Sequence, residues 1–99
     1  MGDTMKKINA IIINGRRWFD KINGNTYHTA SVNVLFANGS DKSFNIPFQY
    51  GYGDQYQFTA WDVLKKAKLV SGSIPWQYCR DNKIKLITNV SDVSRKKDL

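Results

Sequence analysis

Residues 27–48 read YHTASVNVLFANGSDKSFNIPF, and this stretch predicts a β-hairpin. One side of its first arm holds apolar or aromatic residues at alternate positions: His28, Ala30, Val32, Val34 and Phe36. An apolar repeat with a period of two is typical of a strand with one buried face. Asn38-Gly39 is a hairpin-turn signal. The second arm, Lys42–Phe48, alternates again and predicts that Phe44, Ile46 and Phe48 face inward.

The segment before this hairpin predicts a further strand. Lys6–Asn14 holds a run of β-branched isoleucines, and Arg16–Phe19 is expected to continue in extended form. Between them, Asn14-Gly15 is a turn or bulge signal. Asp20–Asn25 is expected to turn the chain back into the hairpin. Because Pro47 lacks a backbone donor, the last arm is expected to lie at a sheet edge or to stop pairing there. The three strands together predict an antiparallel meander.

The residues that follow predict one helix. Asp54 and Gln57 have the spacing of a capping box at a helix start. Beyond them, apolar residues recur at helical spacing: Tyr56, Ala60, Val63, Leu64 and Ala67. Asp62 is expected to pair with Lys66 one turn later. Ser71-Gly72-Ser73 predicts the end of the helix, and Pro75 would prevent the helix from resuming after it.

The last third of the chain predicts a connector, a strand and a tail. Trp76-Gln77-Tyr78 is expected in the connector, and Lys83–Val90 reads as a fourth strand. Residues 92–99, which include Arg95–Lys97, are expected to form a mobile basic tail. The predicted fold is α+β in the order βββαβ, with one helix packed on the sheet.

The composition predicts one basic domain that spans residues 1–99. With 15 Lys and Arg against 8 acidic residues, the formal net charge is +7. The longest apolar run, Ala10–Ile13, is far shorter than the roughly 20 residues of a membrane helix. Because the N-terminus lacks the apolar region of a signal peptide, we expect a cytoplasmic protein without a membrane partner.

Most catalytic and metal-binding chemistries lack their residues in this sequence. One cysteine, Cys79, and one histidine, His28, are too few for a disulfide or a tetrahedral zinc site. We expect His28 in the core with a backbone partner, and Cys79 as a small buried side chain. The aspartates are scattered and form no nuclease pattern, and no phosphate-binding glycine loop is present. We therefore expect no enzymatic activity, no cofactor, no metal and no small-molecule substrate.

Four segments resemble a group of short proteins encoded by bacteriophages and prophages. They are Ile13–Phe19 (INGRRWF), Gly24–His28 (GNTYH), Pro47–Tyr56 (PFQYGYGDQY) and Asp92–Leu99 (DVSRKKDL). The resemblance spans most of the chain from Ile8 onward. That group carries no established activity, so the resemblance implies only a genomic setting. In this setting an accessory protein in the host cytosol would act on nucleic acid or disarm restriction or CRISPR defence.

Two adjacent arginines beside two aromatic residues are the strongest binding signal. Because successive side chains of a strand point to opposite faces, Arg16 is expected to share a face with Trp18, and Arg17 with Phe19. Arginine beside an exposed tryptophan makes a surface that can contact phosphates and stack on bases. The alternative is a solvated arginine beside a core tryptophan.

Other basic and aromatic residues extend this signal. The basic candidates for binding nucleic acid or another partner are Lys65, Lys66, Lys83, Lys85, Arg95, Lys96 and Lys97. For Lys65 and Lys66 the favoured alternative is structural, because cations near the end of a helix complement its dipole. In the tyrosine–glycine loop, residues 49–56, Tyr50 and Tyr52 either contact a partner or cover the sheet edge, whereas Tyr56 is expected in the core. We expect Trp18 and Tyr52 to be exposed.

These observations lead to two hypotheses about function. The first is nucleic-acid binding through the sheet face and the basic segments, because a three-stranded sheet can present a strand face to the major groove. The second is a protein inhibitor that binds a host defence or nuclease complex, of the anti-restriction or anti-CRISPR type. A role in the virion is neither supported nor excluded by the sequence.

Overall fold

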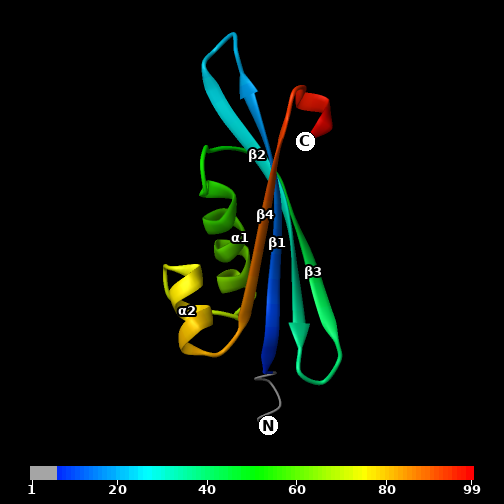
Figure 1. Cartoon of the computed structure of the whole chain (residues 1–99), viewed down its shortest axis with the longest axis vertical. Coiled ribbons are helices and arrows are strands. Elements are labelled where there is room, and N and C mark those ends of the chain that lie inside the picture. The colour runs from blue at the N-terminus through cyan, green and yellow to red at the C-terminus, as the bar shows by residue number, and fades with distance from the viewer. Residues whose placement is uncertain (1–6) are drawn as a thin grey trace.

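The computed structural model describes residues 7–99, and Lys6, the first residue of the expected first strand, lies outside them. The elements in chain order are β1 (Ile8–Asp20), β2 (Asn25–Phe36), β3 (Asp41–Tyr50), α1 (Gln55–Lys66), α2 (Pro75–Asp81), β4 (Lys85–Val93) and a short 3₁₀ helix, η2 (Lys96–Asp98) (Figure 1). The predicted α+β class is confirmed.

The four strands form one mixed sheet in the order β3-β2-β1-β4. The predicted meander is confirmed, because β2 pairs antiparallel with both β1 and β3. The fourth strand lies beside β1 and runs parallel to it. A parallel strand needs a long crossover connection, and the segment that contains α1 and α2 supplies it.

The prediction of a single helix is wrong. Residues 76–78, expected in a connector, lie in α2, which begins at Pro75 because a first helical position needs no backbone donor. Helix α1 ends at Lys66, before the predicted stop at residues 71–73. Lys68 adopts a left-handed φ of 62°, so the chain turns away from the helix earlier than the glycine signal indicates.

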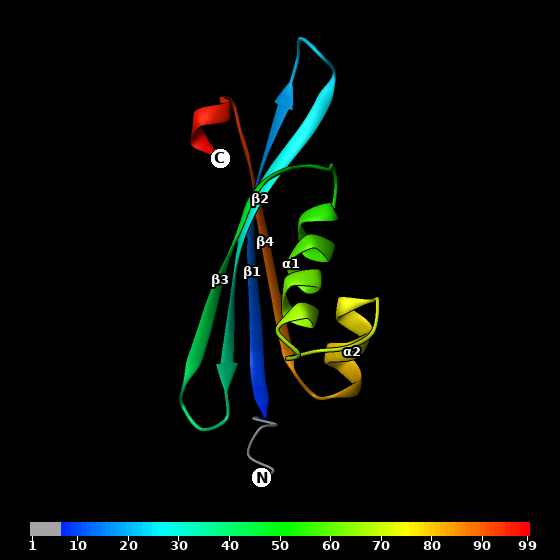
Figure 2. The same cartoon turned by 180° about the vertical axis from the view of Figure 1, so that it is seen from behind.

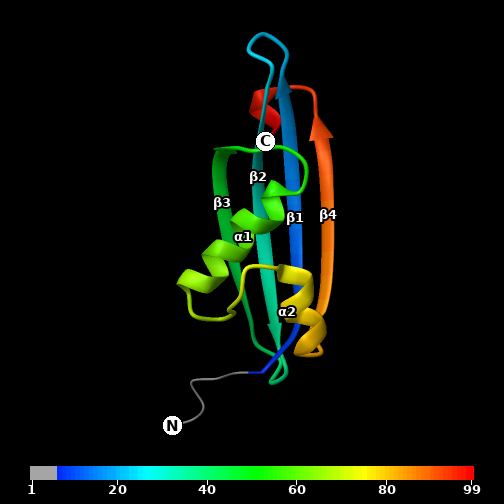
Figure 3. The ribbon, with the colours of Figure 1, turned by 90° about the vertical axis from the view of Figure 1, so that its left-hand side faces the viewer.

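Both helices lie on the same face of the sheet (Figures 2 and 3). The five β2 side chains predicted to face inward are all buried: His28, Ala30, Val32, Val34 and Phe36. Helix α1 buries Tyr56, Ala60, Trp61 and Leu64 in the same core. The core therefore lies between the sheet and the helices, and we call the opposite face of the sheet the open face.

Three local predictions are wrong. Asp54 stands at the N-cap of α1 without a side-chain cap hydrogen bond. The Asp62 carboxylate pairs with Lys65, at 3.5 Å between Oδ1 and Nζ, instead of with Lys66. Strand β4 begins at Lys85 instead of Lys83 and reaches Val93, so residues 92 and 93 belong to the sheet and not to the tail.

The side chains of β3 switch from one face of the sheet to the other near Pro47. Ala30 pairs with Ile46 whereas His28 pairs with Gln49, so β3 carries an extra residue at this point. Such a bulge turns the side chains that follow it to the other face. Phe48, predicted to point inward, is 42% exposed and stacks on Tyr27 instead. The prediction that the strand containing Pro47 is an edge strand is confirmed.

Gly15 lies inside the continuous strand β1, where the sequence predicted a turn or bulge. The irregularity of β1 falls earlier, between Ile8 and Ala10. Gly15 is needed because the Tyr56 ring packs against its backbone. A Cβ atom built on Gly15 would lie 2.5 Å from Cδ2 and 2.7 Å from Cγ of Tyr56.

Gly15→Ala is expected to destabilise the protein by about 1–3 kcal/mol, because the added methyl overpacks a buried ring. The free energy of unfolding in urea measures this cost. Arg16→Ala is the matched control, since this exposed neighbour on the same strand should change stability by less than about 0.5 kcal/mol. Equal stabilities of Gly15→Ala and the parent protein would show that Tyr56 moves aside freely.

Candidate functional site

A row of amide and hydroxyl side chains crosses the open face. Asn14 of β1 is in register with Ser31 of β2 and with Asn89 of β4, and Ser31 is in register with Asn45 of β3. We call these four residues the amide row. Asn89 Nδ2 donates a hydrogen bond to Asn14 Oδ1 at 3.1 Å. One uncharged polar side chain from each strand thus stands on the same line.

A hollow of about 610 Å³ lies over the amide row. Its polar lining comprises the amide row together with Arg16, Thr29 and Ser91. Leu99 lines it as well, although it lies far from the strands in sequence. Among the residues that line this hollow, Arg16 is the only charged side chain. The floor therefore offers hydrogen-bond donors and acceptors beside one fixed positive charge.

The C-terminal turn, residues 94–99, lies against the open face and does not extend away from it (Figure 1). Arg16 Nη1 donates to the carbonyl oxygen of Asp98 at 3.3 Å. The Lys96 Nζ atom lies 4.9 Å from the centre of the Phe48 ring. Arg95 pairs with Asp98 at 3.3 Å between Nε and Oδ2. The turn thus brings Arg95, Lys96 and Lys97 to the open face.

Four aromatic side chains form a cluster on the open face beside the hollow: Trp18, Tyr27, Phe48 and Tyr50. Tyr27 stacks on Trp18 and on Phe48, with ring centres 5.9 and 4.7 Å apart. Tyr50 meets Tyr27 edge-on at 5.8 Å and remains 62% exposed. Trp18, expected to be exposed, is half-buried because it packs in this cluster. Tyr50 therefore offers the most accessible ring.

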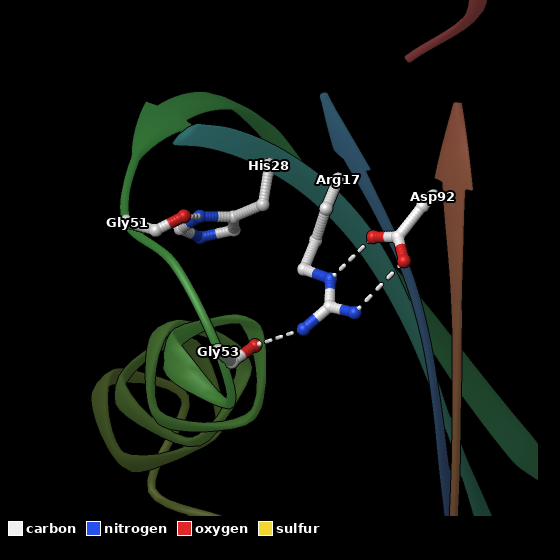
Figure 4. Close-up of polar contacts among 5 residues, drawn as sticks. All are labelled: Arg17, His28, Gly51, Gly53 and Asp92. Atoms are coloured by element: carbon white, nitrogen blue, oxygen red, sulfur yellow. Dashed lines mark hydrogen bonds and ion pairs between the residues drawn. The ribbon is translucent and has the colours of Figure 1, made fainter. Parts of the chain in front are cut away.

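The two adjacent arginines lie on opposite faces of β1, as the sequence predicts. Arg16 points to the open face, whereas Arg17 points to the helix side. There Arg17 Nε and Nη2 donate to the two carboxylate oxygens of Asp92 at 2.8 and 3.1 Å, and Nη1 donates to the Gly53 carbonyl oxygen at 3.1 Å (Figure 4). The hydrogen bonds with Asp92 raise the pKa of Arg17. Arg17 therefore fixes the tyrosine–glycine loop to the end of β4.

His28 is fully buried beneath the same loop, which confirms the prediction of a core histidine. Its Nδ1 lies 3.3 Å from the Gly51 carbonyl oxygen (Figure 4). Its Nε2 lies 3.1 Å from Thr59 Oγ1. Burial lowers the pKa of His28, although the Gly51 hydrogen bond opposes this effect. The imidazole is thus held neutral as a link between β2, the loop and α1.

Stability is expected to fall as the pH is lowered below about 6.5, the ordinary pKa of histidine. The folded state holds His28 at a lowered pKa, so the unfolded state binds the proton more readily and is favoured by acid. Urea unfolding at pH 7.5, 6.5 and 5.5 measures the slope of the free energy of unfolding against pH. All three pH values lie above the ordinary pKa of an aspartic acid. His28→Gln should flatten the slope, and an unchanged slope would assign it to other groups.

Cys79 and the potential metal ligands are the remaining candidates for reactive chemistry. Cys79 is 2% exposed, as the sequence predicts. Burial raises the pKa of its thiol to about 11, so it is a thiol at neutral pH. Within residues 7–99, no three His, Cys, Asp or Glu side chains gather as metal ligands. Over the same range, no helix is long and apolar enough to cross a membrane.

The structure brings together only part of the predicted binding set. Seven residues of this set lie on or beside the open face: Arg16, Trp18, Tyr50, Lys85, Arg95, Lys96 and Lys97. Five lie elsewhere: Arg17 and Tyr52 on the helix side near the loop, Lys65 and Lys66 on α1, and Lys83 in the turn before β4. Tyr52 is 73% exposed, as expected.

Sequence reasoning missed the amide row. Alternation along β2 indicates that Ser31 faces away from the core, but nothing local shows that Asn14, Asn45 and Asn89 lie beside it. The chain matches no protein-family model, no curated protein and no solved structure.

Proposed function

We propose that this protein binds nucleic acid through the open face, as a non-enzymatic accessory protein of the bacteriophage type. The observation that carries the proposal is the hollow over the amide row. Its floor combines neutral hydrogen-bonding side chains with Arg16 and holds no acidic side chain among its lining residues. Such a surface attracts phosphates and leaves amide groups to contact base edges.

The distribution of charge supports this proposal. Asp98, the acidic residue of the C-terminal turn, already has a basic partner, since it pairs with Arg95, whereas Asp92 pairs with Arg17 on the helix side. Lys96 and Lys97 stand at one end of the face, and Lys85 stands at the other end of β4. A phosphate chain laid along the face would therefore meet positive charge at Lys85 and, at the other end, at Arg16 with Lys96 and Lys97.

Titration of labelled DNA and RNA oligonucleotides, in both single-stranded and duplex form, tests the proposal. Arg16→Gln is expected to weaken binding about tenfold, because it removes a charged hydrogen-bond donor from the hollow. It should also flatten the dependence of log affinity on log salt by about one unit. Lys66→Gln is the matched control, since it removes the same charge from the exposed side of α1.

Equal losses in the two variants would show that net charge alone attracts the ligand. Absence of salt-sensitive binding to every oligonucleotide would exclude the proposed function.

The second candidate function is a protein inhibitor of a host complex, and one observation favours it. On the helix layer, Trp76 is 52% exposed and Ile74 is 37% exposed. The Trp76 ring meets Phe58 edge-on, with centres 5.9 Å apart. Exposed tryptophan is enriched at the centres of protein interfaces. This patch lies on the side of the molecule opposite to the open face.

Capture from bacterial lysate treated with nuclease tests this second function. An inhibitor is expected to retain one stoichiometric host protein, and Trp76→Ala is expected to release it. Arg16→Gln is the control, because it alters only the open face. Retention that depends on Arg16 and is lost after nuclease treatment would instead favour the nucleic-acid proposal.

A further inference from the structure

We propose that the open face binds an unpaired polynucleotide strand and not a duplex, an inference that rests on the proposed function. The four-stranded sheet offers a broad surface, and the C-terminal turn lies against it. The hollow in this surface is small. A single strand can place individual bases in such a hollow, whereas a duplex presents its base edges only inside grooves.

The width of the sheet argues against insertion into a major groove. Neighbouring strands lie about 4.8 Å apart, so four strands span about 14 Å between the outer axes before side chains are added. The major groove is only about 12 Å wide. The sequence predicted three strands in the meander, which would be narrower, but β4 lies beside β1 and widens the face. The C-terminal turn, which contacts Arg16, adds further bulk on this face.

The hollow has the size and chemistry expected for exposed bases. Its volume of about 610 Å³ falls within the range of about 300–1,000 Å³ that is usual for small-ligand sites. Asparagine side chains both donate and accept hydrogen bonds, which suits the Watson–Crick edges of unpaired bases. Asn14 and Asn45 are exposed and lie on the two sides of Ser31.

Tyr50 supplies a ring on which a base can stack. It meets Tyr27 with its planes at 77°, so its faces are not covered by a parallel ring of the cluster. The rings of Trp18, Tyr27 and Phe48 already stack on one another. Stacking on aromatic side chains, together with basic residues along the backbone, is how proteins bind single strands without reading a fixed sequence.

One part of the molecule has the dimensions to enter a duplex groove instead. The hairpin tip between β1 and β2 is a two-stranded ribbon, which a major groove can admit. It carries Lys21 and an Ile22 that is 93% exposed. It lacks the amide row and the aromatic cluster, so we expect it to contribute little to binding. Lys21→Gln makes this expectation testable.

The experiment compares oligonucleotides of about 12 nucleotides, a length within the usual range for one single-strand binding domain. The full chain is titrated with a labelled DNA strand of mixed sequence, with the same strand as RNA, and with the duplex of each. The expected result is at least tenfold tighter binding of the single strand than of its duplex. The DNA and RNA arms show which polynucleotide is bound more tightly.

Tyr50→Ala and Tyr52→Ala form a matched pair, because the two tyrosines are both exposed and lie on opposite sides of the sheet. Tyr50→Ala is expected to weaken single-strand binding about tenfold through the loss of one stacked base. Tyr52→Ala is expected to change it by less than about twofold. Circular dichroism should show both variants folded.

The possible outcomes separate this inference from the proposed function. Duplex binding that equals or exceeds single-strand binding, with dependence on Arg16, would overturn the inference and leave the proposed function in place. Dependence on Lys21 would then place the duplex at the hairpin tip. Equal losses in Tyr50→Ala and Tyr52→Ala would overturn the stacking site. Failure of every oligonucleotide to bind would overturn both proposals.

Discussion

Trp61→Ala is expected to destabilise the protein by about 3–5 kcal/mol, the usual cost of truncating a buried aromatic side chain. Trp61 is 1% exposed in the core beneath α1. Its Nε1 donates to the Gly72 carbonyl oxygen at 3.2 Å, and its ring meets Tyr78 of α2 at 5.4 Å. One side chain thus joins α1, the connecting loop and α2.

Domains of this size have a total stability of only about 5–15 kcal/mol, so Trp61→Ala should be largely unfolded in mild denaturant. Urea unfolding followed by circular dichroism measures the loss. Trp76→Ala is the matched control, because it truncates the same residue type on α2 at a position that is 52% exposed. A loss for Trp61→Ala as small as that expected for the exposed Trp76 would show that the packing between the two helices does not depend on Trp61.

Affinity for a single strand is expected to fall about 100-fold between 50 and 200 mM salt. Five basic side chains lie on or beside the open face: Arg16, Lys85, Arg95, Lys96 and Lys97. Each phosphate contact contributes about −0.7 to the slope of log affinity against log salt, so about five contacts give a slope near −3.5. Titration at four or more salt concentrations measures this slope.

Replacement of Lys96 and Lys97 together by glutamine should flatten the slope by about 1.4, because two contacts are lost. Replacement of Lys65 and Lys66 on α1 is the matched control and should leave the slope nearly unchanged. An affinity that stays constant across this range of salt would contradict electrostatic binding on the open face. A slope that changes equally in both double variants would show that contact with the ligand is not confined to this face.

The elements that could be predicted from sequence are those with local signals. Alternation of apolar residues predicted β2 and its buried face, and Asn38-Gly39 predicted the turn after it. The edge position of β3 followed from Pro47, because a missing backbone donor is a property of that residue itself. Helix α2 was missed, since seven residues are too few to show helical periodicity. Trp61 was missed because α1 buries a second side against α2.

Single residues of the candidate site could be predicted from the sequence, but not the way in which they come together. The separation of Arg16 from Arg17 followed from the two-residue period of a strand. The partners of these arginines did not follow, because Asp92 and Asp98 lie 75 and 82 residues away along the chain. The inward direction of Phe48 was mispredicted because a bulge in β3 depends on how two strands pair. No period within one strand reveals it.

The residue order along each strand thus determined which side chains share a face, where the hairpins turn and that His28 is buried, since these properties depend on neighbouring residues. The tertiary structure alone decided that β4 runs parallel beside β1, that Asn89, Asn14, Ser31 and Asn45 stand in one row, and that the C-terminal turn meets Arg16. Strand order and register are set by hydrogen bonds and packing between distant segments, for which the sequence carries no local periodic signal.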